Sequence, residues 1–227
     1  MIQTFDNYEE LSHKAASIIY QKGCEHIKNK GSFLLALAGG NTPKRTYQIL
    51  ADITKNNNEF WNNTQLYWTD ERYVPHEHEW SNYKMAKQSL IDLIPIPAKN
   101  VHPIPTKYTQ PIESADEYAK IFPENIDIII LGMGTDGHIA SIFPNSQAVK
   151  ETEKRFTYDY APSEPKLRIT ATLPTIKSAK EIFILVSGTS KRNAIKQVFD
   201  KSSSITEIPA CALKETATWL VDRDAFS

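Results

Sequence analysis

Three mainly apolar runs of the chain each lead into a turn that contains glycine. The runs span residues 33–38, 126–131 and 182–186, and helical patterns follow the turns at 39–43 and 187–189. Short apolar runs of this kind are typical of strands buried on both faces, as in a parallel sheet. The alternation of strands and helices therefore predicts an α/β fold of three layers, with a mainly parallel sheet between two layers of helices.

Helices are also expected outside these units. Apolar residues at helical spacing predict an opening helix over residues 8–28, ended by Gly31. Thr42 stands where a helix N-cap belongs, with Pro43 in the first turn after it, and Ser81 is a second candidate cap. Each cap would begin a helix directly after a predicted loop.

Four further segments have the pattern of short strands. Residues 65–69 and 218–221 fit strands of the main sheet. Residues 155–160 and 167–173 flank a turn that contains two prolines, which predicts a hairpin. We expect this hairpin to extend the main sheet and make it mixed.

The length and charge of the chain limit its function. With 227 residues, of which 41% are hydrophobic, the chain fits one large α/β domain over residues 1–227. No internal repeat, low-complexity segment or linker divides it. Its 26 basic and 27 acidic residues give a net charge of −1, and basic residues do not cluster with aromatic ones. A nucleic-acid partner is therefore not expected.

The cysteines and the first residues indicate the compartment. Cys24 and Cys211 lie far apart and form no C-x-x-C pair, which fits a reducing compartment better than a disulfide framework. The first ten residues lack the basic start and apolar core of a signal peptide, and no apolar run approaches the ~20 residues that span a bilayer. We expect a cytoplasmic protein without a membrane partner.

Asp136 and His138 follow a predicted strand in the segment DIIILGMGTDGHIASIFP, residues 127–144. In open α/β sheets, ligands bind at the carboxyl ends of the strands. Imidazole titrates near neutral pH, so His138 can act as a base, and Asp136 is a candidate for orienting it. The pair indicates an enzyme that acts on a small molecule.

The same turn also matches the dinucleotide fingerprint G-x-G-x-x-G, at Gly132, Gly134 and Gly137. That fingerprint requires a full crossover helix after it. Pro144 would stop a helix here after about two turns. We therefore do not favour a nicotinamide or flavin enzyme.

The loop over residues 39–43 is a candidate anion site. It presents backbone N–H groups at a helix N-terminus, where the partial positive charge favours phosphate. Taken alone, a plain tight turn explains the loop equally well, but a second glycine turn in the same sheet favours a ligand site. Arg45, Arg168 and Lys191 are cations that could hold an anion, although each also fits a solvated position.

Two charged segments have competing interpretations. Asp70, Glu71 and Arg72 follow a strand, where consecutive charges most often form a solvated turn, but the edge of the crevice also permits contact with substrate. The sequence HEHE at residues 76–79 offers groups that zinc accepts. No third ligand stands at a recognisable spacing, so we interpret that segment as a solvated loop and expect no metal.

Five motifs together resemble a known family. They read LALAGGNTPKRTY, WTDERYVPHEHEWSNY, LGMGTDGHIASIFP, RITATLP and SGTSKRNAI, and they cover nearly the whole chain. The chain is similar to the 6-phosphogluconolactonases of the glucosamine-6-phosphate isomerase/6-phosphogluconolactonase superfamily. This resemblance implies an α/β/α fold like that of NagB, RpiA and the CoA transferases.

The resemblance also implies an activity. It is the hydrolysis of 6-phospho-D-glucono-1,5-lactone to 6-phospho-D-gluconate, the second step of the oxidative pentose phosphate pathway, by a monomer or small homo-oligomer without a cofactor. The family's catalytic histidine corresponds to His138, and we expect Asp136 to support it. Gly134 and Gly137 are expected to contact substrate, and backbone N–H groups of this glycine turn are candidate oxyanion donors. The expected substrate- and phosphate-binding residues are Gly39, Gly40, Asn41, Thr42, Arg45, Asp70, Glu71, Arg72, Asn82, Arg168 and Lys191.

Two departures and two alternatives accompany this resemblance. Asn41 stands where many relatives have Ser or Arg, and Trp80 stands where Asp is common. The main alternative is glucosamine-6-phosphate deaminase, a branch that has a Glu five residues after its histidine, where this chain has Phe143. A non-catalytic sugar-phosphate sensor is the second alternative.

Overall fold

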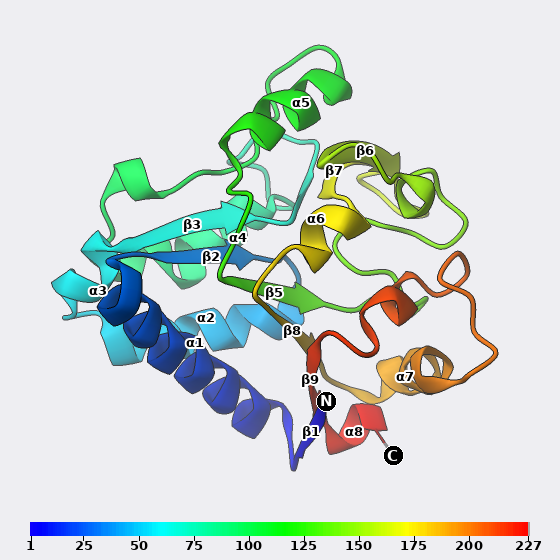
Figure 1. Cartoon of the computed structure of the whole chain (residues 1–227), viewed down its shortest axis with the longest axis horizontal. Coiled ribbons are helices and arrows are strands. Elements are labelled where there is room, and N and C mark those ends of the chain that lie inside the picture. The colour runs from blue at the N-terminus through cyan, green and yellow to red at the C-terminus, as the bar shows by residue number, and fades with distance from the viewer. Residues whose placement is uncertain (227) are drawn as a thin grey trace.

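The central layer of the protein is a six-stranded sheet in which every strand pair is parallel. The structure is a computed structural model that describes residues 1–226. The strand order is β1 (Ile2–Phe5), β9 (Thr218–Asp222), β8 (Glu181–Val186), β5 (Ile128–Gly132), β2 (Phe33–Leu37) and β3 (Thr64–Trp68). Figure 1 shows β5 and β8 in the middle of this sheet. The predicted parallel α/β architecture is confirmed.

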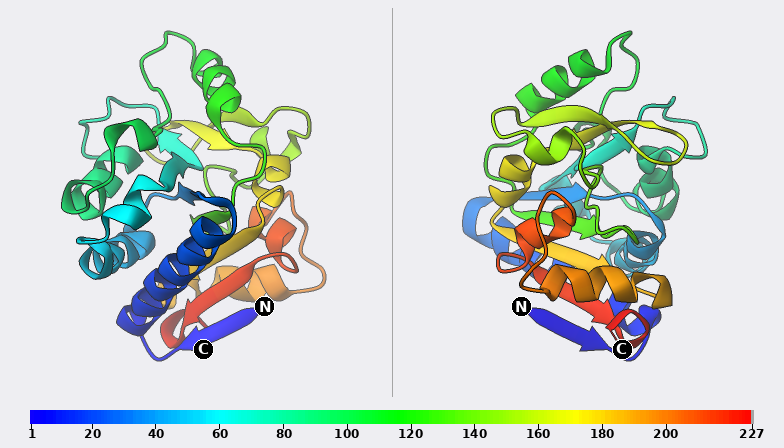
Figure 2. Two further views of the ribbon diagram at one scale, coloured as in Figure 1. Left: turned by 60° about the vertical axis from the view of Figure 1, so that its left-hand side comes forward. Right: turned by 90° about the vertical axis from the view of Figure 1, so that its right-hand side faces the viewer.

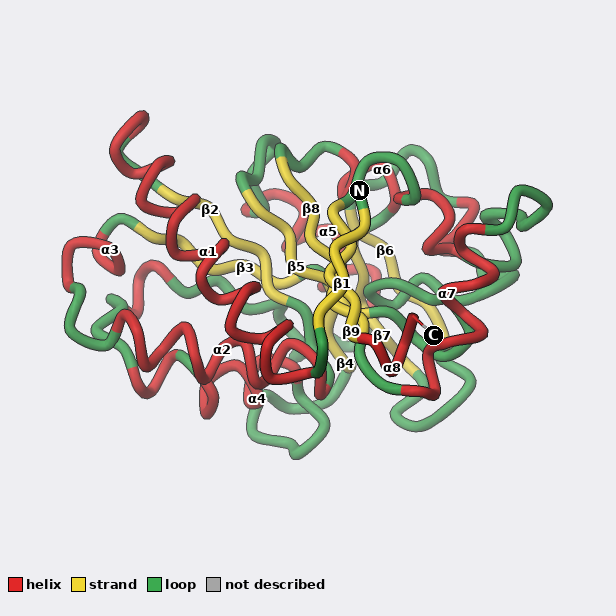
Figure 3. Tube along the Cα trace, turned by 90° about the horizontal axis from the view of Figure 1, so that it is seen from below, coloured by secondary structure: helices red, strands yellow, loops and turns green. Residues whose placement is uncertain are grey.

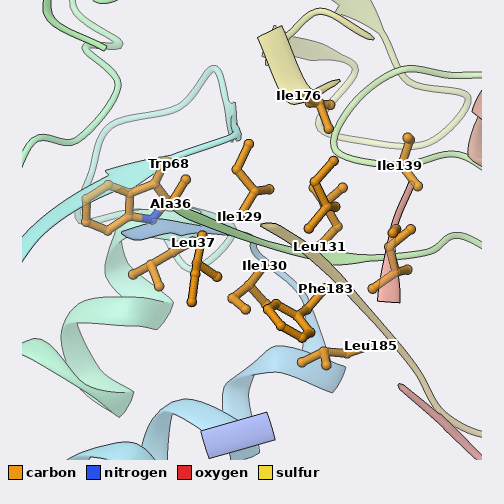
Figure 4. Close-up of a cluster of buried hydrophobic side chains, with 14 of the residues drawn as sticks. Ala36, Leu37, Trp68, Ile129, Ile130, Leu131, Ile139, Ile176, Phe183 and Leu185 are labelled. Carbon is orange, nitrogen blue, oxygen red and sulfur yellow. The ribbon is translucent and has the colours of Figure 1, made fainter. Parts of the chain in front are cut away.

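Helices cover both faces of this sheet. α1 (Tyr8–Lys30) and α2 (Asn41–Thr54) pack together on one face, as the view from below shows (Figure 3). α6 (Leu173–Lys177) lies on the other face, where Ile129 and Leu131 point toward Ile176 while Ile130 points toward the α2 side (Figure 4). The remaining helices are α3 (Asn58–Asn62), α4 (Asn82–Ser89), α5 (Pro111–Ile121), α7 (Arg192–Phe199) and α8 (Arg223–Phe226). Among residues 1–226, no helix combines the length and apolar character needed to cross a membrane.

The predicted hairpin forms, but it belongs to a second sheet. β6 (Phe156–Tyr160) and β7 (Leu167–Ala171) pair antiparallel, and β7 also pairs antiparallel with β4 (Asp70–Arg72). The chain leaves the main sheet at Thr69, whose N–H donates to Leu37 O while its carbonyl accepts from Ala171 N. Thr69 thus joins the two sheets, so the expectation of one mixed sheet is wrong. Figure 2 shows α5 beside β6 and β7.

Local sequence signals give most helix ends correctly. α1 ends at Lys30 and is capped by Gly31, which has a left-handed φ of 79°. The Ser81 side chain caps α4 by accepting from Lys84 N at 3.1 Å. The predicted Thr42 cap is wrong, because α2 begins at Asn41 with Gly40 in the cap position. The edge strand β1 was not predicted, since its four residues, Ile2 to Phe5, are few and do not alternate apolar and polar side chains.

A buried carboxylate joins the elements at the amino ends of the strands. Asp127 accepts a hydrogen bond from Leu34 N at 2.9 Å, and its oxygens lie 2.8 Å from Lys30 Nζ and 2.9 Å from Lys180 Nζ. Burial opposes the charged form, but these donors outweigh it and hold the pKa of Asp127 below its ordinary value. The group therefore stabilises the fold in its ionised state.

We expect Asp127→Asn to lower the free energy of unfolding by about 1–3 kcal/mol at pH 7, because two lysines lose their counter-charge. Since the folded pKa is depressed, the stabilisation is present above the ordinary aspartate pKa and is lost as the pH falls through the folded pKa. Urea denaturation should thus show the difference between wild type and variant shrinking below about pH 4. A difference that persists under acid conditions would contradict this, and Glu117→Gln, in an exposed pair with Lys120, is the control with little expected effect.

Candidate active site

The carboxyl ends of β2, β5 and β8 surround a cavity of about 400 Å³. The two glycine turns predicted to share a crevice both line it. The lining residues are 38–43 after β2, 132–134 with His138 and Ala140 after β5, Ser187, Ser190 and Lys191 after β8, and Asp70, Arg72 and Asn82 from the side.

Asp136 holds the ring of His138 in place. Its Oδ1 lies 2.6 Å from Nδ1 of His138 and accepts the backbone N–H of His138 at 3.1 Å. When Nδ1 donates its proton to the carboxylate, Nε2 is the proton acceptor. Burial opposes the charge of Asp136, but the hydrogen bonds and the charge of His138 outweigh it and lower the pKa of Asp136. The pair thus has the geometry of an oriented general base.

The glycines of this turn permit the arrangement. A Cβ at Gly134 would lie 2.1 Å from Nδ1 of His138, and Gly137 has a φ of 79°. The N–H of Gly134 donates to His138 O at 2.8 Å, and that of Gly137 donates to Gly134 O at 3.2 Å. Both N–H groups are therefore engaged within the turn, and their placement does not support these two as oxyanion donors.

The first turn of α2 faces the cavity without a side-chain cap. Gly40 has a φ of 95°, which favours glycine at this cap position. The unpaired N–H groups of the turn and the helix dipole together favour an anion here. Lys191 also lines the cavity; burial lowers the pKa of Lys191, and the charge of Asp136 partly offsets this. The expected anion loop therefore has a cation in the same cavity.

Asn82 reaches the cavity because Gly39 leaves room for it. A Cβ at Gly39 would lie 1.7 Å from Asn82 Oδ1. Asn82 Nδ2 donates to Asp70 O at 2.9 Å, whereas its buried Oδ1 has no hydrogen-bond partner within residues 1–226. The carboxylate of Asp70 accepts from Ser141 Oγ at 2.7 Å. The structure thus brings Gly39, Asp70 and Asn82 together at one side of the cavity.

Glu71 holds the backbone of Asn82 in place at this side of the cavity. It is 1% exposed, so the interpretation of Asp70 to Arg72 as a solvated turn is wrong. Its carboxylate accepts from the backbone N–H groups of Arg72, Asn82 and Tyr83 at 2.7–2.8 Å and from Ser81 Oγ at 3.1 Å. Burial raises the pKa of Glu71 to about 7, although the three N–H groups oppose the rise. Glu71 therefore fixes the start of α4 and does not line the cavity, so its placement does not support the expected contact with substrate.

We expect Glu71→Ala to lower the free energy of unfolding by about 2–4 kcal/mol, because it leaves buried donors without an acceptor. Urea denaturation measures the loss. An exposed matched change, Glu117→Ala in α5, should cost far less. Equal losses for the two variants would contradict the structural role of Glu71.

Two arginines lie on the second sheet beside the cavity. Arg72 and Arg168 are directly paired across β4 and β7, so their side chains share one face. Arg72 lines the cavity and donates to Trp80 O at 2.6 Å. Arg168 is 6% exposed and is not among the residues that line the cavity, but it lies next to Arg72, and its Nε and Nη1 have no hydrogen-bond partner within residues 1–226. Burial and the charge of Arg72 lower the pKa of Arg168 to about 10. Paired, desolvated cations of this kind favour a bound anion.

Arg45 is not brought to the cavity. It lies one turn into α2 on the side that faces α1, and its Nε is 2.9 Å and 3.2 Å from the carboxylate oxygens of Glu9. The lining of the cavity does not include it. Its placement therefore does not support the expected phosphate contact.

Some residues of the cavity were not predicted. Ser187 and Ser190 line it. Ser187 directly follows the strand predicted at residues 182–186, and Ser190 lies in the short 3-10 helix Thr189–Lys191 that comes next. The rule that ligands bind at strand carboxyl ends could have selected them. Ala140 also lines it with a φ of 48°, a conformation that an alanine rarely adopts and that the sequence does not signal.

The segment over residues 76–79 has structural contacts. His76 Nε2 lies 2.8 Å from Ile104 O, and its ring packs against Tyr83. Within residues 1–226, no three His, Cys, Asp or Glu side chains gather as a group that could hold a metal ion.

Comparison with known proteins places the chain in a family. The family model of the glucosamine-6-phosphate isomerases/6-phosphogluconolactonase matches residues 6–221. A 6-phosphogluconolactonase from Synechocystis sp. is 33% identical over 232 residues, which cover 96% of this chain and 94% of that protein. The structure of a 6-phosphogluconolactonase from Trypanosoma brucei has a TM-score of 0.87 at 27% identity, covering 99% of this chain and 97% of that one.

A monomeric glucosamine-6-phosphate deaminase of the NagB superfamily is also similar, with a TM-score of 0.86 at 26% identity over 99% of this chain and 98% of that one. Fold and cavity together define an α/β enzyme with its site at the carboxyl ends of parallel strands. The chain belongs to the glucosamine-6-phosphate isomerase/6-phosphogluconolactonase family. The resemblance that the sequence motifs indicate is thus confirmed.

Proposed function

We propose that this protein hydrolyses 6-phospho-D-glucono-1,5-lactone to 6-phospho-D-gluconate, the second step of the oxidative pentose phosphate pathway. The observation that carries the proposal is the Asp136–His138 pair, with 2.6 Å between Oδ1 and Nδ1, at a cavity that also holds cationic groups. A base beside an anion site suits the hydrolysis of a phosphorylated lactone. The full-length similarity to 6-phosphogluconolactonases supports it.

In the proposed reaction, Nε2 of His138 takes a proton from water while the water oxygen bonds to the lactone carbonyl carbon. The resulting tetrahedral intermediate carries its negative charge on the former carbonyl oxygen. The bond between C1 and the ring oxygen then breaks, and the imidazolium returns its proton to that oxygen. The carboxylic acid product loses its own proton to solvent. Asp136 stabilises the imidazolium between the two transfers.

The other end of the substrate supplies binding energy. The proposed phosphate contacts are the first turn of α2, Lys191, and the pair of Arg72 and Arg168. Binding a remote phosphate fixes the position of the carbonyl relative to His138, so this energy contributes to turnover as well as to affinity. The buried, unpartnered nitrogens of Arg168 support this assignment.

Phe143 argues against the deaminase alternative. A deaminase must move a proton between adjacent carbons, and that branch has a glutamate five residues after its histidine. Here the ring of Phe143 packs on the imidazole of His138, with the ring centroids 4.8 Å apart, and supplies no carboxylate. The overall fold does not separate the two activities, because the deaminase structure is as similar as the lactonase structures.

Two reactions run side by side test the proposal. One follows 6-phosphogluconate formation from fresh lactone by NMR, and the other follows ammonia release from glucosamine 6-phosphate. We expect lactone hydrolysis above the spontaneous rate and no ammonia. Ammonia release without hydrolysis would establish the deaminase, and tight binding without either reaction would favour a sensor.

We expect Arg168→Met to lower kcat/KM about 100-fold for 6-phosphogluconolactone and less than about threefold for gluconolactone, which lacks the phosphate. The substitution keeps an unbranched, flexible side chain but removes the guanidinium group and its charge. Arg192→Met is the matched control, because Arg192 donates to Asp224 O outside the cavity. Equal losses on the two lactones would exclude a role of Arg168 at the phosphate.

A further inference from the structure

Ser187 lies beside the turn that carries His138. It follows β8 directly and lines the cavity. β8 runs parallel to β5 with Leu185 opposite Gly132, so both strands leave the sheet at the same edge. Ser187 is therefore placed next to a ligand that binds in the cavity near the proposed base.

The hydroxyl proton of Ser187 is directed at Asp222. Asp222 ends β9, is 1% exposed, and accepts from Ser187 Oγ at 2.5 Å. Its carboxylate also accepts the backbone N–H groups of Gly188 at 3.1 Å and Ala225 at 2.9 Å. The three groups that contact this carboxylate within residues 1–226 are all donors, so Ser187 donates its proton to Asp222. The neighbouring peptide of Gly188 is held by the same carboxylate.

This direction determines what Ser187 can do in the cavity. A hydroxyl has one proton, and once it is used the oxygen can only accept. The anion-binding groups of the cavity, which are the first turn of α2, Arg72 and Lys191, are donors that suit the phosphate. The hydroxyl groups of a sugar lactone need acceptors as well. Ser187 is an acceptor with a fixed orientation.

We propose that Ser187 accepts a hydrogen bond from one ring hydroxyl of the substrate, and that Asp222 is the positioning residue that keeps Ser187 in this acceptor state. The inference rests on the proposed function, because the hydroxyl belongs to the sugar lactone. It makes the Ser187–Asp222 pair a determinant of specificity for a hydroxylated substrate. An acceptor that is left without its donor partner penalises a deoxygenated analogue.

The test compares wild type with Ser187→Ala on 6-phosphogluconolactone and on its 2-, 3- and 4-deoxy analogues. We expect the variant to lose about tenfold in kcat/KM on the parent and on two analogues, but nothing on the analogue that lacks the partner hydroxyl. No loss on the parent, or an equal loss on all four lactones, would overturn the inference. Ser202→Ala is the matched control, because Ser202 donates to Asp200 at 2.8 Å in an exposed pair.

Asp222→Asn tests the positioning role. The amide oxygen can still accept from Gly188 and Ala225, while the amide nitrogen donates to Ser187 Oγ and releases the serine proton toward the cavity. We expect the same pattern across the four lactones as for Ser187→Ala, and no further loss in the double variant. Asp222 would have only a structural role if the losses of kcat/KM in the two single variants added up in the double variant, or if Asp222→Asn lost equally on all four lactones. Circular dichroism and thermal melting establish that each variant is folded.

The rate of wild type on the parent lactone separates this inference from the proposed function. If wild type does not turn over the lactone, the proposed function fails, and the comparison moves to calorimetric binding of 6-phosphogluconate and its monodeoxy forms. The acceptor role would still be supported if Ser187→Ala bound 6-phosphogluconate about tenfold more weakly than wild type but bound one deoxy form as tightly as wild type does. Equal affinities for wild type and variant would overturn it.

Discussion

Replacing His138 with alanine is expected to lower kcat for 6-phosphogluconolactone by about 10² to 10⁴, because the variant lacks the group that takes the proton from water. The affinity for 6-phosphogluconate should stay within about threefold of wild type, since the proposed phosphate contacts lie on other elements. A coupled assay with 6-phosphogluconate dehydrogenase measures kcat, and calorimetry measures product binding.

His13→Ala is the matched control for this variant. His13 is a surface histidine that pairs with Glu9 on α1, and its loss should leave kcat unchanged. A His138→Ala variant with near-normal kcat would remove His138 from the mechanism. A variant that loses product affinity in the same proportion as kcat would assign His138 to binding.

Asp136→Asn is expected to lower kcat by about 10- to 100-fold with little change in KM. The amide oxygen can still accept both hydrogen bonds that His138 donates to Asp136 Oδ1, so the ring keeps its position. The variant loses the negative charge that stabilises the imidazolium between the two proton transfers. Steady-state kinetics on the lactone separate kcat from KM.

The pH dependence gives a second readout for Asp136. The pKa of Asp136 lies below its ordinary value, so the carboxylate is ionised throughout the neutral range. Titration of Asp136 itself should therefore not change the wild-type kcat between about pH 6 and 8. A rise in KM as large as the fall in kcat would contradict a purely electrostatic role. Asp200→Asn, at an exposed carboxylate that accepts from Ser202, is the control.

Local sequence patterns predict the main sheet well, because its central parallel strands appear in the sequence as short, mainly apolar runs. The runs at residues 33–38, 126–131 and 182–186 are buried on both faces, so their composition identifies them without knowledge of their neighbours. Each is confirmed as a strand, and the turn with Asp136 and His138 lies at the expected edge. The rule that ligands bind at the carboxyl ends of strands is enough to find this part of the site.

Contacts between residues far apart in the sequence set the positions of the other side chains in and around the site, so local sequence patterns do not predict them. Three consecutive charges at Asp70 to Arg72 predict a solvated turn, but Glu71 is buried because α4 presents its first N–H groups to the carboxylate. Arg45 has the right position in the sequence for an anion site, yet the helix rotates it toward Glu9. The Ser187–Asp222 pair joins residues 35 positions apart, so no local pattern contains it.

The most direct test of the proposed function is the initial rate of opening of freshly generated 6-phosphogluconolactone at increasing protein concentration, with wild type and His138→Ala in one assay and the spontaneous rate subtracted. We predict a rate proportional to the wild-type concentration and a rate near the spontaneous background for the variant. Equal rates for the two proteins, or no wild-type rate above background, would contradict it.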